Sequence, residues 1–287
     1  MLDAIAIGVG AAGYLLALIA AGTVLCLNLF AFLPETERQR LMHRAWIAGP
    51  LAIVLLIGKV QLDAVFLAGG EWAAAFDTEL LGFILAGSAG QALTVFSAGI
   101  VLTALVGFSG VLARSAALFG VILIAVSFGL TGHGWGSGNL WLSALIALHI
   151  LGLSFWVGVF PPLHRLCITD QAAAARLAHR FGQMALWVVP ALAVAGLVTL
   201  HQLTGGLIAA LETRYGQFFA LKLSLFGVVM GLAAYHRFLL TPALERGQAQ
   251  AGVRLRRSLR FEGALMVAIL IVTATLTHLT GPGSGSG

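Results

Sequence analysis

Histidine is the residue type whose placement points most directly to chemistry in this sequence. Three histidines each end an apolar stretch together with a nearby threonine, in segments 130–133, 199–201 and 276–278. Thr and His are also ordinary residues at helix ends near a membrane surface, and that alternative stays open. A neutral imidazole is a common ligand for copper, zinc and haem iron. We therefore predict a metal site formed by these three histidines and a fourth within an apolar stretch: His133, His149, His201 and His278.

The fourth histidine, His149, is the one that lies deepest in its apolar stretch. It is about 8 residues, roughly 12 Å along a helix, from the end of that stretch. An ionisable group at such a depth in a membrane span indicates a function by default. Gly152 and Trp156 follow at i+3 and i+7 and share its helix face, so a neighbouring helix could approach there. The structural alternative is a neutral imidazole bonded to a carbonyl or hydroxyl of another helix.

Other polar residues within apolar stretches have both a structural and a functional interpretation. Lys222 would reach the membrane surface or pair with a carboxylate. Glu262 would form a salt bridge with Arg237 or Arg260, and its alternative role is to accept a proton or a metal ion. We expect Trp156, Lys222 and Glu262 to be structural residues near the site.

Sulfur ligands occur towards the other ends of the apolar stretches. Thiolate and thioether groups select Cu(I). His164 and Cys167 are three residues apart and share a face if their helix continues. A methionine in a span is also an ordinary core residue. We predict a second set of ligands, for a metal ion that leaves the protein on the inner side of the membrane: Cys26, His164, Cys167 and Met230.

The elements that would position these residues are transmembrane helices. Apolar residues make up 60% of the 287 positions and charged residues 9%, a balance that indicates a lipid environment. A span needs about 20 mostly apolar residues. We predict an all-α integral membrane protein, a bundle of eight transmembrane helices over 5–33, 45–68, 80–107, 112–132, 139–163, 181–204, 216–240 and 259–280. They form one domain, 1–281, followed by a flexible tail or linker, 282–287. Gly227 and Gly231 form a GxxxG pair that predicts close helix packing.

The arginines predict the orientation of this bundle. Thirteen of the fourteen lie in alternate connections between the spans, and Arg214 alone lies on the other side. The positive-inside rule then places both termini on the periplasmic side. The same scattered arrangement argues against nucleic-acid binding in spite of the basic pI. The spans contain none of the common nucleophile, phosphate-binding or zinc-protease motifs, so we do not expect an enzyme.

Several short motifs resemble the copper resistance D (CopD) family of bacterial inner-membrane proteins. The His-then-Trp-Gly segment LHILGLSFWVGVFPPL is at 148–163. Further matching motifs follow in the order and spacing of the family: Arg180-Phe181-Gly182, Tyr215-Gly216, Leu221-Lys222-Leu223, His236-Arg237-Phe238 with Pro242, and Arg257-Ser258-Leu259 with Glu262. The resemblance covers mainly residues 130–281. It implies a protein of eight spans that transports or delivers copper at the inner membrane, often with a small periplasmic copper-binding partner.

Three hypotheses remain open at this point. The first is copper transport or delivery through the periplasm-facing histidine site. The second is a haem b protein for electron transfer or oxidase assembly, in which two histidines on facing helices ligate the iron. The third is a histidine-bearing membrane scaffold without a prosthetic group.

Overall fold

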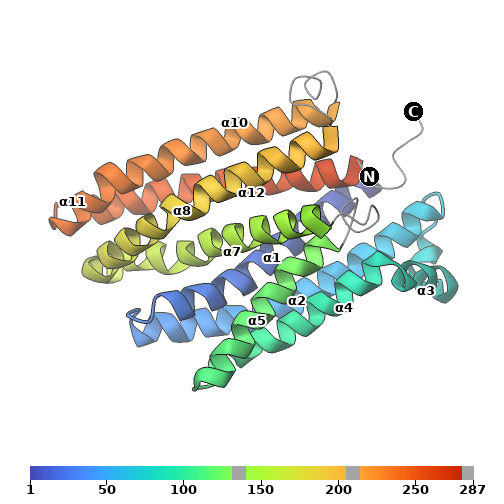
Figure 1. The fold of residues 1–287 in the computed structure, drawn as a ribbon, viewed down its shortest axis with the longest axis horizontal. Helices are drawn as coiled ribbons and strands as arrows, with labels where there is room; N and C mark the ends of the chain where they lie inside the picture. Colours follow the sequence, from blue (N-terminus) through green and yellow to red (C-terminus); the bar gives the residue numbers. More distant parts are fainter. Residues whose placement is uncertain (131–139, 205–213, 280–287) are drawn as a thin grey trace.

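The computed structural model describes residues 1–130, 140–204 and 214–279, and this part of the chain is almost entirely helical (Figure 1). Eight helices are long and apolar enough to cross a membrane, which confirms the predicted fold class. They are built on α1 (Leu2–Leu29), α2 (Glu35–Leu67), α4 (Ser88–Thr103), α5 (Val111–Gly129), α7 (Leu140–Thr169), α8 (Gln171–Thr204), α10 (Arg214–Tyr235) and α12 (Ala251–Leu279).

Short elements complete or interrupt these helices. The predicted span 80–107 is divided at Gly87, which is extended between α3 (Thr78–Ala86) and α4. Asp77 begins α3 by accepting hydrogen bonds from the N–H groups of Glu79 and Leu80. The 3₁₀ turns η1 (Trp72–Phe76) and η2 (Ala104–Gly107) flank α3 and α4, and α10 continues through the π-helix η3 (His236–Leu240) into α11 (Thr241–Glu245).

The long helices extend beyond the predicted spans at their polar ends. Helix α2 begins at Glu35 rather than at residue 45, with Glu35 and Glu37 in its first turn, where carboxylates stabilise a helix. Helix α8 begins at Gln171 rather than at 181, and the Asp170 carboxylate accepts a hydrogen bond from the N–H of Ala173. Hydropathy marks only the apolar part of a helix, so these polar first turns appeared as connections.

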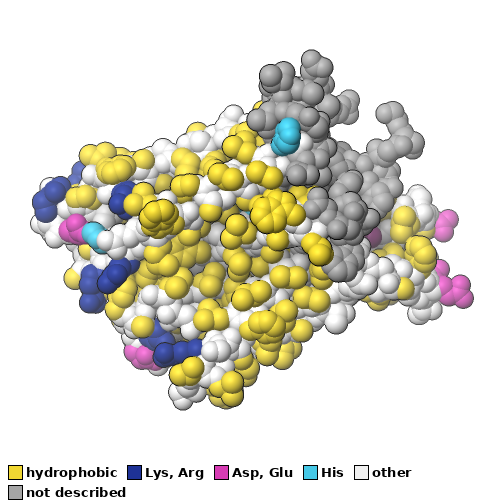
Figure 2. All heavy atoms as spheres, in the orientation of Figure 1, with side chains coloured by type: hydrophobic (Ala, Val, Ile, Leu, Met, Phe, Trp, Pro, Cys, Tyr) yellow, Lys and Arg dark blue, Asp and Glu magenta, His cyan; other side chains and the backbone are white. Residues whose placement is uncertain are grey.

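The helices lie side by side with α7 in a central position (Figure 1). Helix α7 packs against α1, α5, α8 and α12. The turns between α1 and α2 and between α7 and α8 are at the same end of the bundle as α11, and α1 begins at the opposite end. Figure 2 shows Lys and Arg side chains gathered at the first of these ends, with hydrophobic side chains covering the middle of the bundle. We call the arginine-bearing end the basic end.

Close packing depends on glycines at two of the helix crossings. A Cβ on Gly22 would overlap the backbone of Ser154 and Gly158, so α1 and α7 touch backbone to backbone. Gly99 and Gly120 join α4 to α5 in the same way. The predicted packing role of Gly227 and Gly231 is wrong, because a Cβ at either position would meet nothing within 4 Å among the described residues.

Candidate functional site

His149 is a partly buried residue of α7 that lies beside α8. A Cβ on Gly152, one turn along, would be 2.6 Å from the Leu192 side chain of α8, so the predicted close approach at this glycine is confirmed. The imidazole lies beside the Leu192 backbone and within electrostatic range of Lys222 on α10. Its Nδ1 is buried and has no hydrogen-bond partner within the described ranges. This nitrogen is the buried polar atom most obviously available to a ligand.

Two turns further along α7, Trp156 is part of a second polar group. Its indole Nε1 donates a hydrogen bond of 2.9 Å to Oε1 of Glu262 on α12, and the two residues are 3% and 2% exposed. Nδ1 of His236 lies 3.2 Å from the other carboxylate oxygen of Glu262, and Nε2 of His236 lies 2.7 Å from the Ser258 hydroxyl. The Trp156–Glu262 cluster, as we call these four residues, therefore joins α7, η3 and α12.

The local backbone explains how His236 reaches this cluster. His236 opens the π-helix η3, and Pro242 follows immediately inside α11. Proline has no N–H and its ring clashes with the carbonyl four residues earlier, here that of Phe238. The regular α-helical bonding cannot continue through Phe238, and π-helical turns of this kind are frequent at functional sites.

Sequence reasoning missed His236 as the partner of Glu262. The expected partners were Arg237 and Arg260, but Arg260 instead donates from Nε to Nε2 of His164, at 3.4 Å. Arg256 donates to the same nitrogen at 3.2 Å. The only signal for His236 was its place in the motif His236-Arg237-Phe238 before Pro242, and nothing in that spacing indicates Glu262, which lies on another helix.

The predicted exit ligands lie in different surroundings. Cys26 and Cys167 are free thiols, 1% and 0% exposed, within one apolar cluster formed mainly by α1, α7, α8 and α12. His164, in contrast, faces the arginines of α12. Met230 is half-buried on α10. Helix α7 continues to Thr169, so His164 and Cys167 lie one turn apart, and Arg256 of α12 is near both of them.

The predicted histidine set is only partly within the described residues. His201 is exposed on α8. His133 lies outside the described residues, as does the side chain of His278. Within the ranges that the structure describes, no group of three or more His, Cys, Asp or Glu side chains is placed to hold a metal ion. The convergence of the four histidines stays a prediction.

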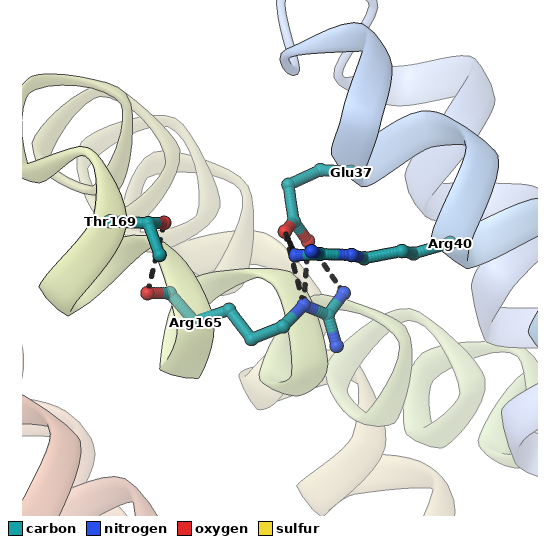
Figure 3. Close-up of polar contacts among 4 residues, drawn as sticks. All are labelled: Glu37, Arg40, Arg165 and Thr169. Carbon is teal, nitrogen blue, oxygen red and sulfur yellow. Dashed lines mark hydrogen bonds and ion pairs between the residues drawn. The ribbon is translucent and has the colours of Figure 1, made fainter.

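At the basic end, a buried carboxylate holds two helices together (Figure 3). Glu37 at the start of α2 accepts hydrogen bonds from Nε and Nη2 of Arg165 near the end of α7, with the Nε contact at 2.8 Å. It also accepts a 2.8 Å hydrogen bond from Arg40, one turn along α2. The Glu37 side chain is 3% exposed and that of Arg165 is 20% exposed.

The fold and these buried polar groups define a multi-pass membrane protein of the all-α class. Residues 175–276 match the family model described as Copper resistance protein D. That region of the chain is similar to the copper resistance D family, and the resemblance predicted from its motifs is confirmed.

Two curated relatives extend this comparison. The chain is 28% identical over 280 residues to "Copper transport protein CutJ" of Bacillus subtilis (strain 168), which covers 91% of this chain and 50% of that protein. It is 28% identical over 171 residues to "Copper resistance protein D" of Pseudomonas syringae pv. tomato, which covers 55% of this chain and 54% of that protein. The chain spans about half the length of the curated relatives it matches. No solved structure matches the chain significantly.

Proposed function

We propose that this chain transports or delivers copper across a bacterial inner membrane, and that it receives the ion at imidazoles on the periplasmic side. Support for copper comes from the family match over 175–276 and from the names of the two relatives. In the same proposal the basic end lies in the cytoplasm by the positive-inside rule, and both termini lie on the periplasmic side. Residues 1–281 act as a single transmembrane domain without enzymatic turnover.

The observation that carries this proposal is that Nδ1 of His149 is buried with no hydrogen-bond partner among the described residues. A polar atom buried without a partner costs free energy, and an ionisable group kept within a membrane span in spite of this cost usually marks a functional site. A copper ion would use the lone pair of that nitrogen. The proposed companions of His149 are His133, His201 and His278. The exposure of His201 on α8 supports this proposal, because a ligand that receives an ion must be accessible.

The nearby charge of Lys222 bears on how copper would leave this site. An ammonium group within electrostatic range of His149 repels a bound cation, so the site would bind copper for passage rather than for storage. The proposed inner-side ligands are Cys26, His164, Cys167 and Met230. A small periplasmic copper-binding protein is the proposed partner that supplies the ion.

The test is copper uptake into proteoliposomes that contain the purified chain. We expect His149→Ala to reduce uptake and copper binding about 10- to 100-fold, because loss of a residue that only hydrogen-bonds to a metal ligand already has an effect of this size. The control is His179→Ala, which removes an exposed imidazole paired with Glu245 at the basic end. Equal uptake by the native chain and His149→Ala would refute the imidazole site. A Soret band in the native sample that is lost in His149→Ala would favour haem b ligation instead.

A further inference from the structure

The basic end contains an open hollow of about 610 Å³ that the copper proposal does not use. It lies between the first turns of α2 and the last turns of α7, and its lining residues are Thr36, Gln39, Arg40, His43, Arg44 and Arg165. All six carry hydrogen-bond donors, and three of them carry a permanent positive charge. Such a lining favours an oxyanion with several acceptor oxygens.

The charges around the hollow do not balance within the described residues. Glu37 is the buried carboxylate beside it, and its two oxygens are occupied by Arg165 and Arg40. Glu35 at the edge is exposed, is paired with Arg38 outside the lining, and accepts a hydrogen bond of 3.4 Å from the amide of Gln39 in the lining. Arg44 makes no ion pair or side-chain hydrogen bond in the part of the chain that the structure describes. Three arginines against one carboxylate leave two positive charges for an external anion to neutralise.

The side chains that follow along α2 place the hollow at the level of lipid headgroups. Trp46 is 44% exposed, its ring lies 5.9 Å from that of His43, and its Nε1 donates a hydrogen bond to the Ala104 carbonyl. Tryptophan in such a position is typical of the membrane–water interface. Next come exposed apolar residues, Ile47, Leu51 and Val54, which form a lipid-facing surface. The hollow therefore lies where an apolar, lipid-facing surface ends and a basic surface begins.

We propose that this hollow binds the phosphate of an anionic phospholipid headgroup. The arginine guanidinium groups match phosphate oxygens in pairs, and basic pockets between transmembrane helices on the cytoplasmic side are known to accommodate anionic headgroups. The Thr36 hydroxyl adds a neutral donor, and the Gln39 amide has a second N–H besides the one that it donates to Glu35. Two uncompensated charges match a headgroup with two phosphates better than one with a single phosphate. This site does not depend on copper transport, and it shares with the proposed function only the cytoplasmic placement of the basic end.

The test measures lipid binding by the full chain in detergent micelles. The probes are cardiolipin, phosphatidylglycerol, phosphatidylcholine and inorganic phosphate, each added to the purified native chain, Arg44→Gln, Arg44→Lys and Arg254→Gln. Arg44 has no internal ion pair to lose, so Arg44→Gln should fold, which its unfolding temperature without lipid will verify. Arg254 is exposed at the same end but outside the hollow, and its variant is the matched charge control.

We expect cardiolipin to raise the unfolding temperature of the native chain most, followed by phosphatidylglycerol, with no rise for phosphatidylcholine or inorganic phosphate. Arg44→Gln should weaken cardiolipin binding about fivefold, Arg44→Lys less, and Arg254→Gln hardly at all. Equal weakening by Arg44→Gln and Arg254→Gln would overturn the proposal, because it would show attraction to the basic end as a whole. An equal effect of inorganic phosphate would overturn the assignment to a lipid.

Discussion

Glu262 is the carboxylate on which the buried contacts between α7, η3 and α12 depend. It accepts the Trp156 indole N–H and lies against His236 while 2% exposed. Replacing it with alanine leaves both partners without their carboxylate in an apolar setting, where such a group cannot turn to water. A glutamine side chain still presents an oxygen to Trp156.

We expect Glu262→Ala to lower the free energy of unfolding by about 1 kcal/mol and Glu262→Gln by less than half of that. Unfolding of the purified chain in mixed micelles, followed by tryptophan fluorescence, measures both. If Glu262→Ala and Glu262→Gln are equally stable, the indole hydrogen bond contributes nothing to stability and the cluster is held by packing alone.

Individual site residues were predictable to the extent that neighbours along one helix decide their placement. His149, Gly152 and Trp156 share α7, so their spacing alone indicated the close approach of a neighbouring helix, which the structure shows to be α8. The partner of Glu262 could not be predicted, because the distance between η3 and α12 depends on tertiary packing. The sequence offered Arg237 and Arg260 as candidates and gave no means to prefer His236. The same limit applies to the metal set, whose four histidines belong to separate spans.

At the scale of helices, α1 and α7 cross with their backbones in direct contact. Gly22 faces the backbone of Ser154 and Gly158, and Gly158 faces the backbone of Gly22. An added methyl group at either position would meet main-chain atoms, which cannot turn away as a side chain can. The two helices would have to separate, and every contact between them would weaken.

We expect Gly22→Ala to destabilise the protein by about 1 to 3 kcal/mol, the usual cost of overpacking. Gly227→Ala is the matched control within α10, where nothing lies within 4 Å, and it should leave stability unchanged or raise it by about 0.5 kcal/mol. Thermal unfolding of both variants in detergent measures the difference. A Gly22→Ala variant as stable as Gly227→Ala would show that α1 and α7 are not in backbone contact.

Hydropathy predicted the eight spans but not which glycines lie at crossings. These helices are apolar on most faces because lipid surrounds them, so the alternation of polar and apolar faces that orients a helix in a soluble protein is weak. The GxxxG pair on α10 therefore looked like a packing face, whereas the glycines in contact are isolated ones such as Gly22, Gly99 and Gly129. Polar helix ends were likewise assigned to connections.

For the whole molecule, the Glu37–Arg165 pair connects residues that are far apart in the sequence. It ties the start of α2 in the first half to the end of α7 in the second half (Figure 3). The carboxylate is nearly inaccessible, so its loss would leave the Arg165 guanidinium without its counter-charge at a partly buried position. Removing one partner of such a pair costs more than the pair itself contributes.

We expect Glu37→Gln to lower the free energy of unfolding by about 2 kcal/mol, and Arg165→Gln to lower it by a similar amount. The double variant should be more stable than the sum of the two losses predicts, since neither charge is then left alone. A double-mutant cycle of thermal unfolding measures this coupling. Additive losses would show that Glu37 and Arg165 act independently. Arg254→Gln serves as the control for removing one positive charge from the same end.

The backbone contact between α1 and α7 also restricts how the protein can move. Two helices that touch through main-chain atoms have no side chains at the contact whose rotation could absorb sliding, so α1 and α7 shift as one unit. The contact between α7 and α8 beside His149 is different, because there Gly152 meets the flexible end of the Leu192 side chain. If passage of an ion requires the bundle to open and close, we expect α8 to move relative to α7, while α1 and α7 stay together.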